Sequence, residues 1–149
     1  MRRIKSHGID VTLFVVLGSR SDTLDDFRRT LELADRLGVG VHPVLLTPLP
    51  GTELFAEYEP YLLPGIGWDG FTGTRAVFDH PDPAMTPAAR EQAYFETSLE
   101  LLSPGRIARH LGAIPSAGFP MTHLLSLMKS LPMRRAMRRA YDEWKAKEA

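Results

Sequence analysis

The chain has 149 residues, enough for one domain with a hydrophobic core, and its 44% hydrophobic and 24% charged residues are ordinary for a globular protein. The formal net charge is zero, so no overall field favours a membrane surface, and we expect no nucleic-acid partner. The absence of cysteine excludes disulfides, thiolate metal sites and an iron–sulfur cluster held by these residues. No apolar run approaches the roughly 20 residues that span a bilayer, and the basic N-terminus lacks the apolar part of a signal peptide. We therefore expect a cytoplasmic protein without a transmembrane segment.

A strand and a helix are predicted at the start of the chain. Residues 9–17 are rich in β-branched and aromatic residues, and their nearly continuous apolar character predicts a strand buried on both faces of a parallel sheet. A helix is predicted over 23–37, because apolar residues recur there at helical spacing. Ser21 or Asp22 suits its N-cap, and Gly38 suits the position just after its last turn.

A second apolar strand is predicted over 39–47. Pro43 lies within it and cannot donate a ladder hydrogen bond, so we expect a bulge or a locally unpaired position. A strand, a helix and a strand joined by short connections form a right-handed βαβ unit with adjacent parallel strands. Because so small a parallel sheet cannot cover its own edges, we expect this part of the chain to belong to a larger sheet.

The rest of the sequence predicts helices separated by irregular segments. Thr52 suits the N-cap of a short helix that ends near Tyr58, and an irregular stretch rich in proline, glycine and aromatic residues follows over 59–73. The further expected elements are a short strand over 75–78, helices over 87–102, 106–111, 121–131 and 133–147, and a linker over 113–120.

Two motifs occupy the points where the predicted strands end. At Gly18 the lack of a side chain lets a ligand approach the backbone, and the helix that follows presents free N–H groups to an anion. The second motif, Thr47–Thr52, is a rigid loop with two prolines and a glycine. Taken singly, each motif favours the simpler interpretation, a turn with a structural role.

Together with three later motifs, these segments resemble the C-terminal half of radical S-adenosylmethionine enzymes, most closely the cobalamin-binding subgroup. The resemblance covers residues 7–111, and nothing in 112–149 contributes to it. Arg20 departs from the family pattern, because many members have proline there. The matching residues are Gly18, Asp22 and Thr23, then Thr47 to Thr52, then Trp68, Phe71 and Gly73, then Val77, Phe78 and Pro81, then Met85, Thr86 and Pro87.

The resemblance implies an α/β fold, a partial (half) parallel β/α barrel followed by a helical C-terminal tail. Residues 1–83 would be the last βα units of the barrel, 84–112 a helical extension and 113–149 a helical basic tail. In the family, a reduced iron–sulfur cluster cleaves S-adenosylmethionine, and the resulting chemistry methylates or rearranges unactivated carbon. In the family, the cluster cysteines and the cobalamin domain lie N-terminal to the matched region, so we expect the chain to be a fragment of a longer protein or the product of a truncated or split gene. Its partners would be the missing N-terminal half, or a partner chain, and a small-molecule substrate.

The resemblance also implies the residues of a site, although it assigns no catalytic residue and no metal ligand. Trp68 and Phe71 are candidates to close over substrate, with packing against a small core as the alternative, which is favoured for Phe71. The residues implied to line S-adenosylmethionine are Gly18, Ser19, Asp22, Thr47 and Pro48.

The remaining polar residues give weaker signals. The histidines show no metal-ligand spacing, and Asp79, His80 and Asp82 lie in a proline-rich loop where we expect them to be solvated. From Lys129 onward there are seven bases against three acids, whereas residues 53–100 carry nine acids against two bases. The acidic stretch is therefore a plausible intramolecular counterpart of the basic tail.

Two other functions stay open. The chain could be a non-catalytic, degenerate half-barrel that binds a partner chain through its sheet edge and its basic C-terminal helix. It could also be a membrane-surface or nucleic-acid adaptor that acts through residues 129–147. A solvated helix that packs its methionine and leucine face on the domain is the simpler interpretation of that segment.

Overall fold

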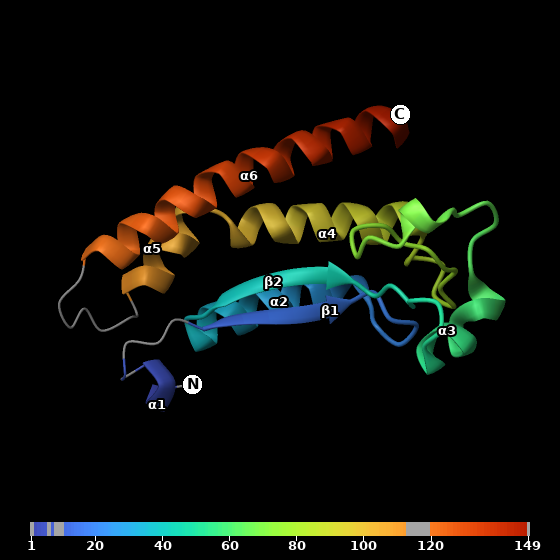
Figure 1. Cartoon of the computed structure of the whole chain (residues 1–149), viewed down its shortest axis with the longest axis horizontal. Helices are drawn as coiled ribbons and strands as arrows, with labels where there is room; N and C mark the ends of the chain where they lie inside the picture. Colours follow the sequence, from blue (N-terminus) through green and yellow to red (C-terminus); the bar gives the residue numbers. More distant parts are fainter. Residues whose placement is uncertain (1, 6, 8–10, 113–119, 149) are drawn as a thin grey trace.

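The computed structural model describes residues 2–5, 7, 11–112 and 120–148. It is an α/β structure with a two-stranded parallel sheet (Figure 1). In chain order the elements are α1 (Arg2–Lys5), β1 (Thr12–Leu17), α2 (Leu24–Leu37), β2 (Gly40–Leu45), α3 (Glu53–Tyr58), the 3₁₀ turns η1 (Glu59–Tyr61) and η2 (Trp68–Gly70), α4 (Pro87–Leu101), α5 (Pro104–Gly112) and α6 (Pro120–Glu148).

The two strands pair in parallel over their whole length. Thr12 lies opposite Gly40 at one end of the sheet, and Leu17 lies opposite Leu45 at the other. Helix α2 connects them, so the prediction of adjacent parallel strands joined by a helix is confirmed.

Pro43 lies inside β2, opposite Val15, without the expected bulge. The N–H groups of Gly40 and Leu46 both donate to carbonyls of the β1 segment. Because N–H groups alternate in direction along a strand, the odd-numbered residues of β2 direct their nitrogens away from β1. The missing N–H of Pro43 therefore falls on the outer edge of the sheet, and the ladder between the strands stays regular.

Helices cover one face of the sheet, and on the other face the side chains of β1 are exposed. On the covered face Leu17 and Leu45 join a core that includes Phe27 of α2 and aromatic residues of α4. On the opposite face the side chain of Phe14 is 75% exposed and that of Val16 is 54% exposed. The expectation that the first strand is buried on both faces is therefore wrong for this chain, because Phe14 and Val16 on one face of β1 are exposed.

The N-cap of helix α2 lies one residue after Asp22 and two after Ser21, the two expected caps. Its N-cap is Thr23, whose N–H donates to the Asp26 carboxylate at 2.8 Å, rather than Ser21 or Asp22. This hydrogen bond holds the pKa of Asp26 below its usual range. The helix ends as expected at Gly38, whose φ of 59° is in the left-handed region that glycine adopts without strain.

Helix α6 is continuous through Pro132, although the sequence predicts two helices that are separated at this proline. Proline removes one helical hydrogen bond, but side chains beyond it hold the helix against α4. Arg134 donates to the carbonyl of Leu99, and the Tyr141 ring stacks on Phe95 at 5.3 Å. Tertiary contacts thus outweigh the local signal. Of the expected linker over 113–120, all but the last residue lies outside the described residues.

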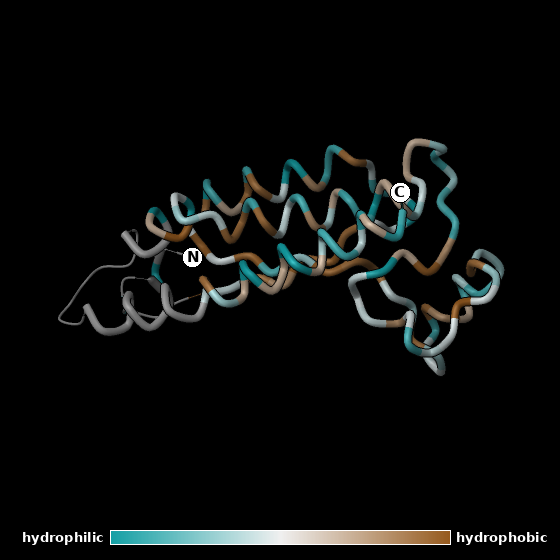
Figure 2. The backbone as a smooth tube through the Cα atoms, turned by 90° about the horizontal axis from the view of Figure 1, so that it is seen from above, coloured by the Kyte–Doolittle hydropathy of each residue, from teal (hydrophilic) through white to brown (hydrophobic). Residues whose placement is uncertain are grey.

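The segment between β2 and α4 folds into a lobe at the carboxyl ends of the strands (Figures 1 and 2). Tyr58, Val77 and Phe78 form its buried core, with relative exposures of 6%, 0% and 0%. The short strand expected over 75–78 is absent, because Phe78 makes one isolated antiparallel bridge to Leu62 instead of a ladder. None of the described helices has the length and apolar character needed to cross a membrane.

Candidate ligand site at the carboxyl ends of the strands

The turn after β1 is shaped by Gly18 and Asp22. Gly18 has a φ of 81°, which a side chain would strain. A Cβ atom there would lie 3.4 Å from Leu45 and 3.6 Å from Arg90, so the space beside it is already filled by the protein. The Asp22 carboxylate accepts from the Ser19 N–H at 3.0 Å, and the Asp22 N–H donates back to the Ser19 carbonyl at 3.0 Å.

His80 ties the lobe to this turn. The Nδ1 atom of His80 accepts from the Asp82 N–H at 3.0 Å, so the ring proton lies on Nε2. That Nε2 atom is 2.9 Å from the carbonyl oxygen of Ser19, to which it donates. The expectation that His80 is simply solvated is therefore wrong, because both of its ring nitrogens bond to the backbone.

Arg20 makes a second link between the turn and the lobe. Its guanidinium carbon lies 3.4 Å from the centre of the Tyr61 ring, and its Nη1 donates to the Asp79 carbonyl at 2.9 Å. The Arg20 N–H is 3.4 Å from the hydroxyl of Tyr58. A stacked guanidinium with one bonded nitrogen keeps other N–H groups for a carboxylate or a phosphate.

Thr47 and Pro48 occupy the end of the neighbouring strand. The Thr47 hydroxyl donates to the Leu45 carbonyl at 3.2 Å and accepts from the Gly73 N–H at 3.1 Å. The Gly73 carbonyl in turn accepts from the Leu45 N–H at 2.7 Å. The side chain of Pro48 is fully buried. Both residues lie where the sequence places them, but here they hold the lobe against β2.

We expect Thr47→Val to weaken this junction. The hydroxyl is lost while the shape is kept, so the Gly73 N–H loses its acceptor at a cost of about 1–2 kcal/mol in the free energy of unfolding. Urea denaturation measures the loss, and hydrogen exchange should accelerate at the Gly73 amide. Thr72→Val is the control, because the exposed Thr72 hydroxyl bonds only to that of Thr74. Equal stability of the two variants would contradict a structural role for Thr47.

Arg90 is a buried cation beneath the turn. It is 1% exposed, its Nη2 donates to the Phe78 carbonyl, and its guanidinium lies 4.7 Å from the centre of the Phe78 ring. Its Nε has no hydrogen-bond partner among the described residues. Burial lowers the pKa of Arg90, and the charges of Asp79 and Glu91 oppose that shift. In the sequence, Arg90 is one of the two bases of the acidic stretch 53–100, and no local pattern indicates that it is buried.

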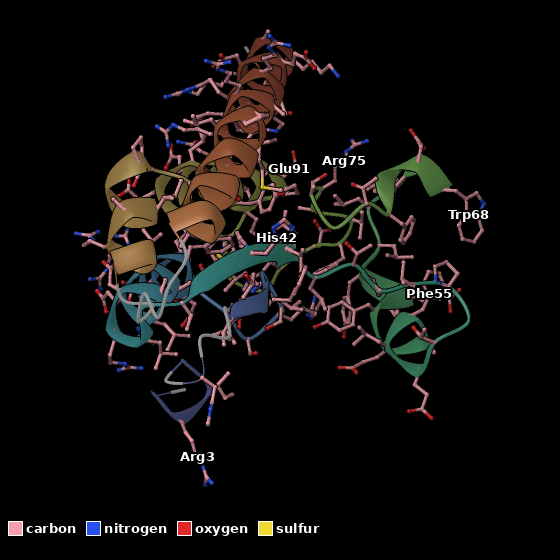
Figure 3. The ribbon with its side chains drawn as sticks, turned by 60° about the vertical axis from the view of Figure 1, so that its left-hand side comes forward. Arg3, His42, Phe55, Trp68, Arg75 and Glu91 are labelled. Atoms are coloured by element: carbon pink, nitrogen blue, oxygen red, sulfur yellow. The ribbon has the colours of Figure 1, made fainter. Side chains whose placement is uncertain are left out.

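Trp68 and Phe71 lie in the lobe, away from the turn after β1. The Trp68 side chain is 77% exposed and projects outward from the structure (Figure 3). Phe71 packs against the lobe core, and its ring centre is 6.0 Å from that of Trp68 and 6.3 Å from that of Phe55. The packing interpretation favoured for Phe71 matches this position. Trp68 has a free face that a ligand could cover.

The strand ends thus bring Gly18, Ser19, Asp22, Thr47 and Pro48 to one side of the sheet. The polar groups of Asp22 and Thr47 are used within the protein. The exposed groups there are the hydroxyls of Ser19 and Ser21, which lie 3.1 Å apart, together with the guanidinium of Arg20. Within the described residues, no group of three histidine or acidic side chains could hold a metal ion. The arrangement is suited to hydrogen bonding a polar or anionic ligand.

A separate apolar groove of about 670 Å³ lies at the other end of the sheet. It runs between the start of β2, the end of α4, helix α5 and helix α6, and its lining includes Val41, Pro43, Leu101, Ile107, Met133 and Met137. None of the predicted site residues lines it. Arg106 at its rim is paired with Asp35 at 2.7 Å and with Glu100 at 3.1 Å.

The fold and these strand ends define an α/β protein built on one parallel βαβ unit, with a loop-rich lobe over the carboxyl ends of its strands. Comparisons with protein-family models, with curated proteins and with solved structures find no match to this chain. The geometry of the strand ends and the order of the motifs are therefore the grounds for a functional proposal.

Proposed function

We propose that this chain supplies the last βα units of a radical S-adenosylmethionine barrel of the cobalamin-binding kind. It would form part of the wall around S-adenosylmethionine and substrate at the carboxyl ends of β1 and β2. The cluster and the cobalamin would be held outside this chain, in an N-terminal half or a partner chain. A cytoplasmic location fits the proposal, because thiolates that hold a cluster need a reducing compartment.

The exposed face of β1 is the observation that carries the proposal. In an α/β barrel the helices cover only the outer face of the strands, and the inner face lines the interior of the barrel. Here α2 and α4 pack on the face that carries Leu17 and Leu45. On the other face, Phe14 and Val16 of β1 are apolar and exposed, and the ring of His42 in β2 lies 5.1 Å from that of Phe14. In a complete barrel, that face would be buried in the interior.

The groups at the strand ends fit part of S-adenosylmethionine. The hydroxyls of Ser19 and Ser21 are suited to the ribose hydroxyls, and Arg20 to the carboxylate. Asp22, Thr47 and Pro48 would act by holding the backbone in place, because their own groups are engaged or buried. When bound, S-adenosylmethionine and a reduced cluster would supply a radical able to attack an unactivated carbon. No cysteine of this chain could ligate that cluster.

A non-catalytic half-barrel that binds a partner chain is the second candidate. The bases of the tail support it, because Arg135, Arg138 and Arg139 are exposed on α6. No ion pair joins the described part of the tail to the acids of residues 53–100. The link is instead by hydrogen bonds, from Tyr141 to Glu96 at 2.9 Å and from Trp144 to Glu91 at 2.6 Å. The positive charge of this helix therefore stays available to an acidic partner.

The coding sequence upstream of Met1 gives the first test of the proposal. We expect it to encode the three-cysteine cluster motif in frame, or a neighbouring gene to do so. The protein with that half restored should bind S-adenosylmethionine in anaerobic calorimetry. Ser19→Ala should weaken binding by about fivefold to tenfold, the effect of one lost hydrogen bond. Ser103→Ala, which lies between α4 and α5, is the matched control and should leave the affinity unchanged.

The chain by itself should bind no iron–sulfur cluster, because it has no thiolate to offer. Anaerobic reconstitution followed by absorption and Mössbauer spectroscopy measures this. A stoichiometric cluster on the isolated chain would overturn the proposal that the cluster is held outside this chain.

Unchanged affinity for S-adenosylmethionine in a folded Ser19→Ala variant would remove the turn after β1 from the ligand site. Gly18→Val is unsuitable as a test, because the positive φ of Gly18 makes any side chain there perturb the fold as well.

A further inference from the structure

The two outer edges of the sheet differ in their ability to accept another strand. In the β1–β2 ladder, Gly40 donates to Val11 and Leu46 donates to Leu17. Together with the register, these bonds direct Leu13, Val15 and Leu17 of β1 toward β2. The backbone N–H and C=O groups of the even-numbered residues of β1 therefore form one outer edge of the sheet. Those of the odd-numbered residues of β2 form the other.

The outer edge of β2 is closed. Pro43 has no N–H to donate at its centre, and the Leu45 N–H already donates to the Gly73 carbonyl at 2.7 Å. Helix α4 also packs against this strand. An incoming strand would find no continuous row of donors on β2.

The outer edge of β1 is open. Thr12, Phe14 and Val16 direct their N–H and C=O groups outward, and within the described part of the chain nothing bonds to them. No residue from Thr12 to Leu17 is charged, and none is proline. Natural sheets protect an exposed edge with charges, prolines or bulges, and β1 has none of these devices. Its outer edge is therefore a site for strand addition.

We propose that a second copy of this chain occupies that edge, with the two β1 strands antiparallel about a two-fold axis at Phe14. In this register Phe14 faces Phe14 of the other copy, and Thr12 of each copy faces Val16 of the other. All three outward N–H groups of each copy then find a carbonyl, as in the hydrogen-bonded pairs of an antiparallel ladder. The same row serves both copies, which an isologous dimer requires.

The side chains favour this pairing as well. The exposed rings of the two Phe14 residues meet side by side, and exposed Val16 packs beside the methyl group of Thr12. No like charges face each other along the strands, because residues 12–17 are uncharged. The inference depends on the strand edge alone and not on the proposed function. Within the proposed barrel, a strand of the remaining barrel would take the same edge.

Sedimentation velocity of the intact chain over a range of concentrations tests the dimer, together with amide hydrogen exchange followed by nuclear magnetic resonance. We expect a monomer–dimer equilibrium in which the Thr12, Phe14 and Val16 amides are protected. Phe14→Pro removes an outward N–H and the paired ring but no N–H of the β1–β2 ladder, so it should give a folded monomer. Phe14→Lys keeps that N–H but places a charge on the edge. It should also be monomeric, with exchange at Thr12 and Val16 at least about tenfold faster than in the wild type.

Leu49→Lys is the matched control, because Leu49 is also an exposed apolar residue, at 54%, but lies away from β1. It should dimerise as the wild type does. A wild-type chain that stays monomeric at all concentrations would overturn the proposal, as would a folded Phe14→Lys variant that still dimerises. Far-ultraviolet circular dichroism establishes which variants fold. If Phe14→Pro does not fold, Phe14→Lys and the exchange of the Thr12 and Val16 amides decide the result.

Discussion

Phe78→Ala is expected to lower the free energy of unfolding by about 3–5 kcal/mol, the usual cost of removing a fully buried aromatic ring. Phe78 is completely buried, and its ring contacts Tyr58 edge to face with centres 4.7 Å apart. Its carbonyl accepts from Arg90, and its backbone bridges to Leu62. The variant therefore loses a core residue of the lobe and disturbs its junction with α4. Since small domains are stable by about 5–15 kcal/mol, this is a large share of the total.

Urea denaturation followed by circular dichroism measures the effect of Phe78→Ala. Trp68→Ala is the control, because it also removes a large aromatic ring, but one that is 77% exposed. Its free energy of unfolding should change by less than about 0.5 kcal/mol. Comparable losses in the two variants would show that the lobe is not built on Phe78.

Tyr141→Ala is expected to release α6 from the rest of the structure and to cost about 3–5 kcal/mol. Tyr141 is 3% exposed, stacks on Phe95 and lies 5.8 Å from the ring of Trp144. Its hydroxyl donates to Glu96 at 2.9 Å. Hydrogen exchange along α6 should accelerate, and urea denaturation should show the loss. Glu143→Ala, at an exposed position of the same helix, should leave both unchanged. Unchanged hydrogen exchange along α6 in Tyr141→Ala would contradict this anchoring role.

Alkaline pH should release the same helix. Burial raises the pKa of Tyr94 and of Tyr141, and the hydrogen bond of Tyr141 to Glu96 raises the second further. A tyrosine with a raised pKa in the folded state contributes stability as the neutral phenol. This contribution is complete below the ordinary tyrosine pKa of about 10 and is lost as the pH rises through the raised pKa. Phenolate absorbance and circular dichroism should therefore change together above that pH. Ionisation of Tyr141 with no structural change would count against this coupling.

Local signals in the sequence predicted several helix ends correctly. Thr52 caps α3 by accepting from the Phe55 N–H at 3.1 Å, and Thr86 caps α4 by accepting from the Ala89 N–H at 3.1 Å. Gly38 ends α2 in the left-handed region. These features depend on residues three or four positions apart, so the sequence displays them directly. Helix α6 passes through Pro132 because distant aromatic residues hold it, and no local signal reports such contacts.

For the candidate site residues, the sequence predicted their places in the fold but not their interactions. The sequence places Gly18 and Thr47 at the ends of parallel strands, and the structure has them there. The bonds that shape this region join residues about sixty positions apart, such as His80 to Ser19 and Arg20 to the Asp79 carbonyl. Spacing in one sequence carries no signal for such pairs. Arg90 was missed for the same reason, because only the fold brings its side chain beneath Gly18.

The closed edge of β2 has a consequence for how far this chain can associate. Fibres elongate when each added copy leaves an unpaired strand edge to which the next copy can bind. A copy paired through β1 presents only β2, where Pro43 and the bond from Leu45 to Gly73 leave no free row of donors for a further strand. Edge pairing therefore terminates at two copies. Pro43, the bond from Leu45 to Gly73 and the packing of α4 on β2 together separate a finite assembly from an endless one, and Pro43→Val would remove only the first of these barriers to elongation.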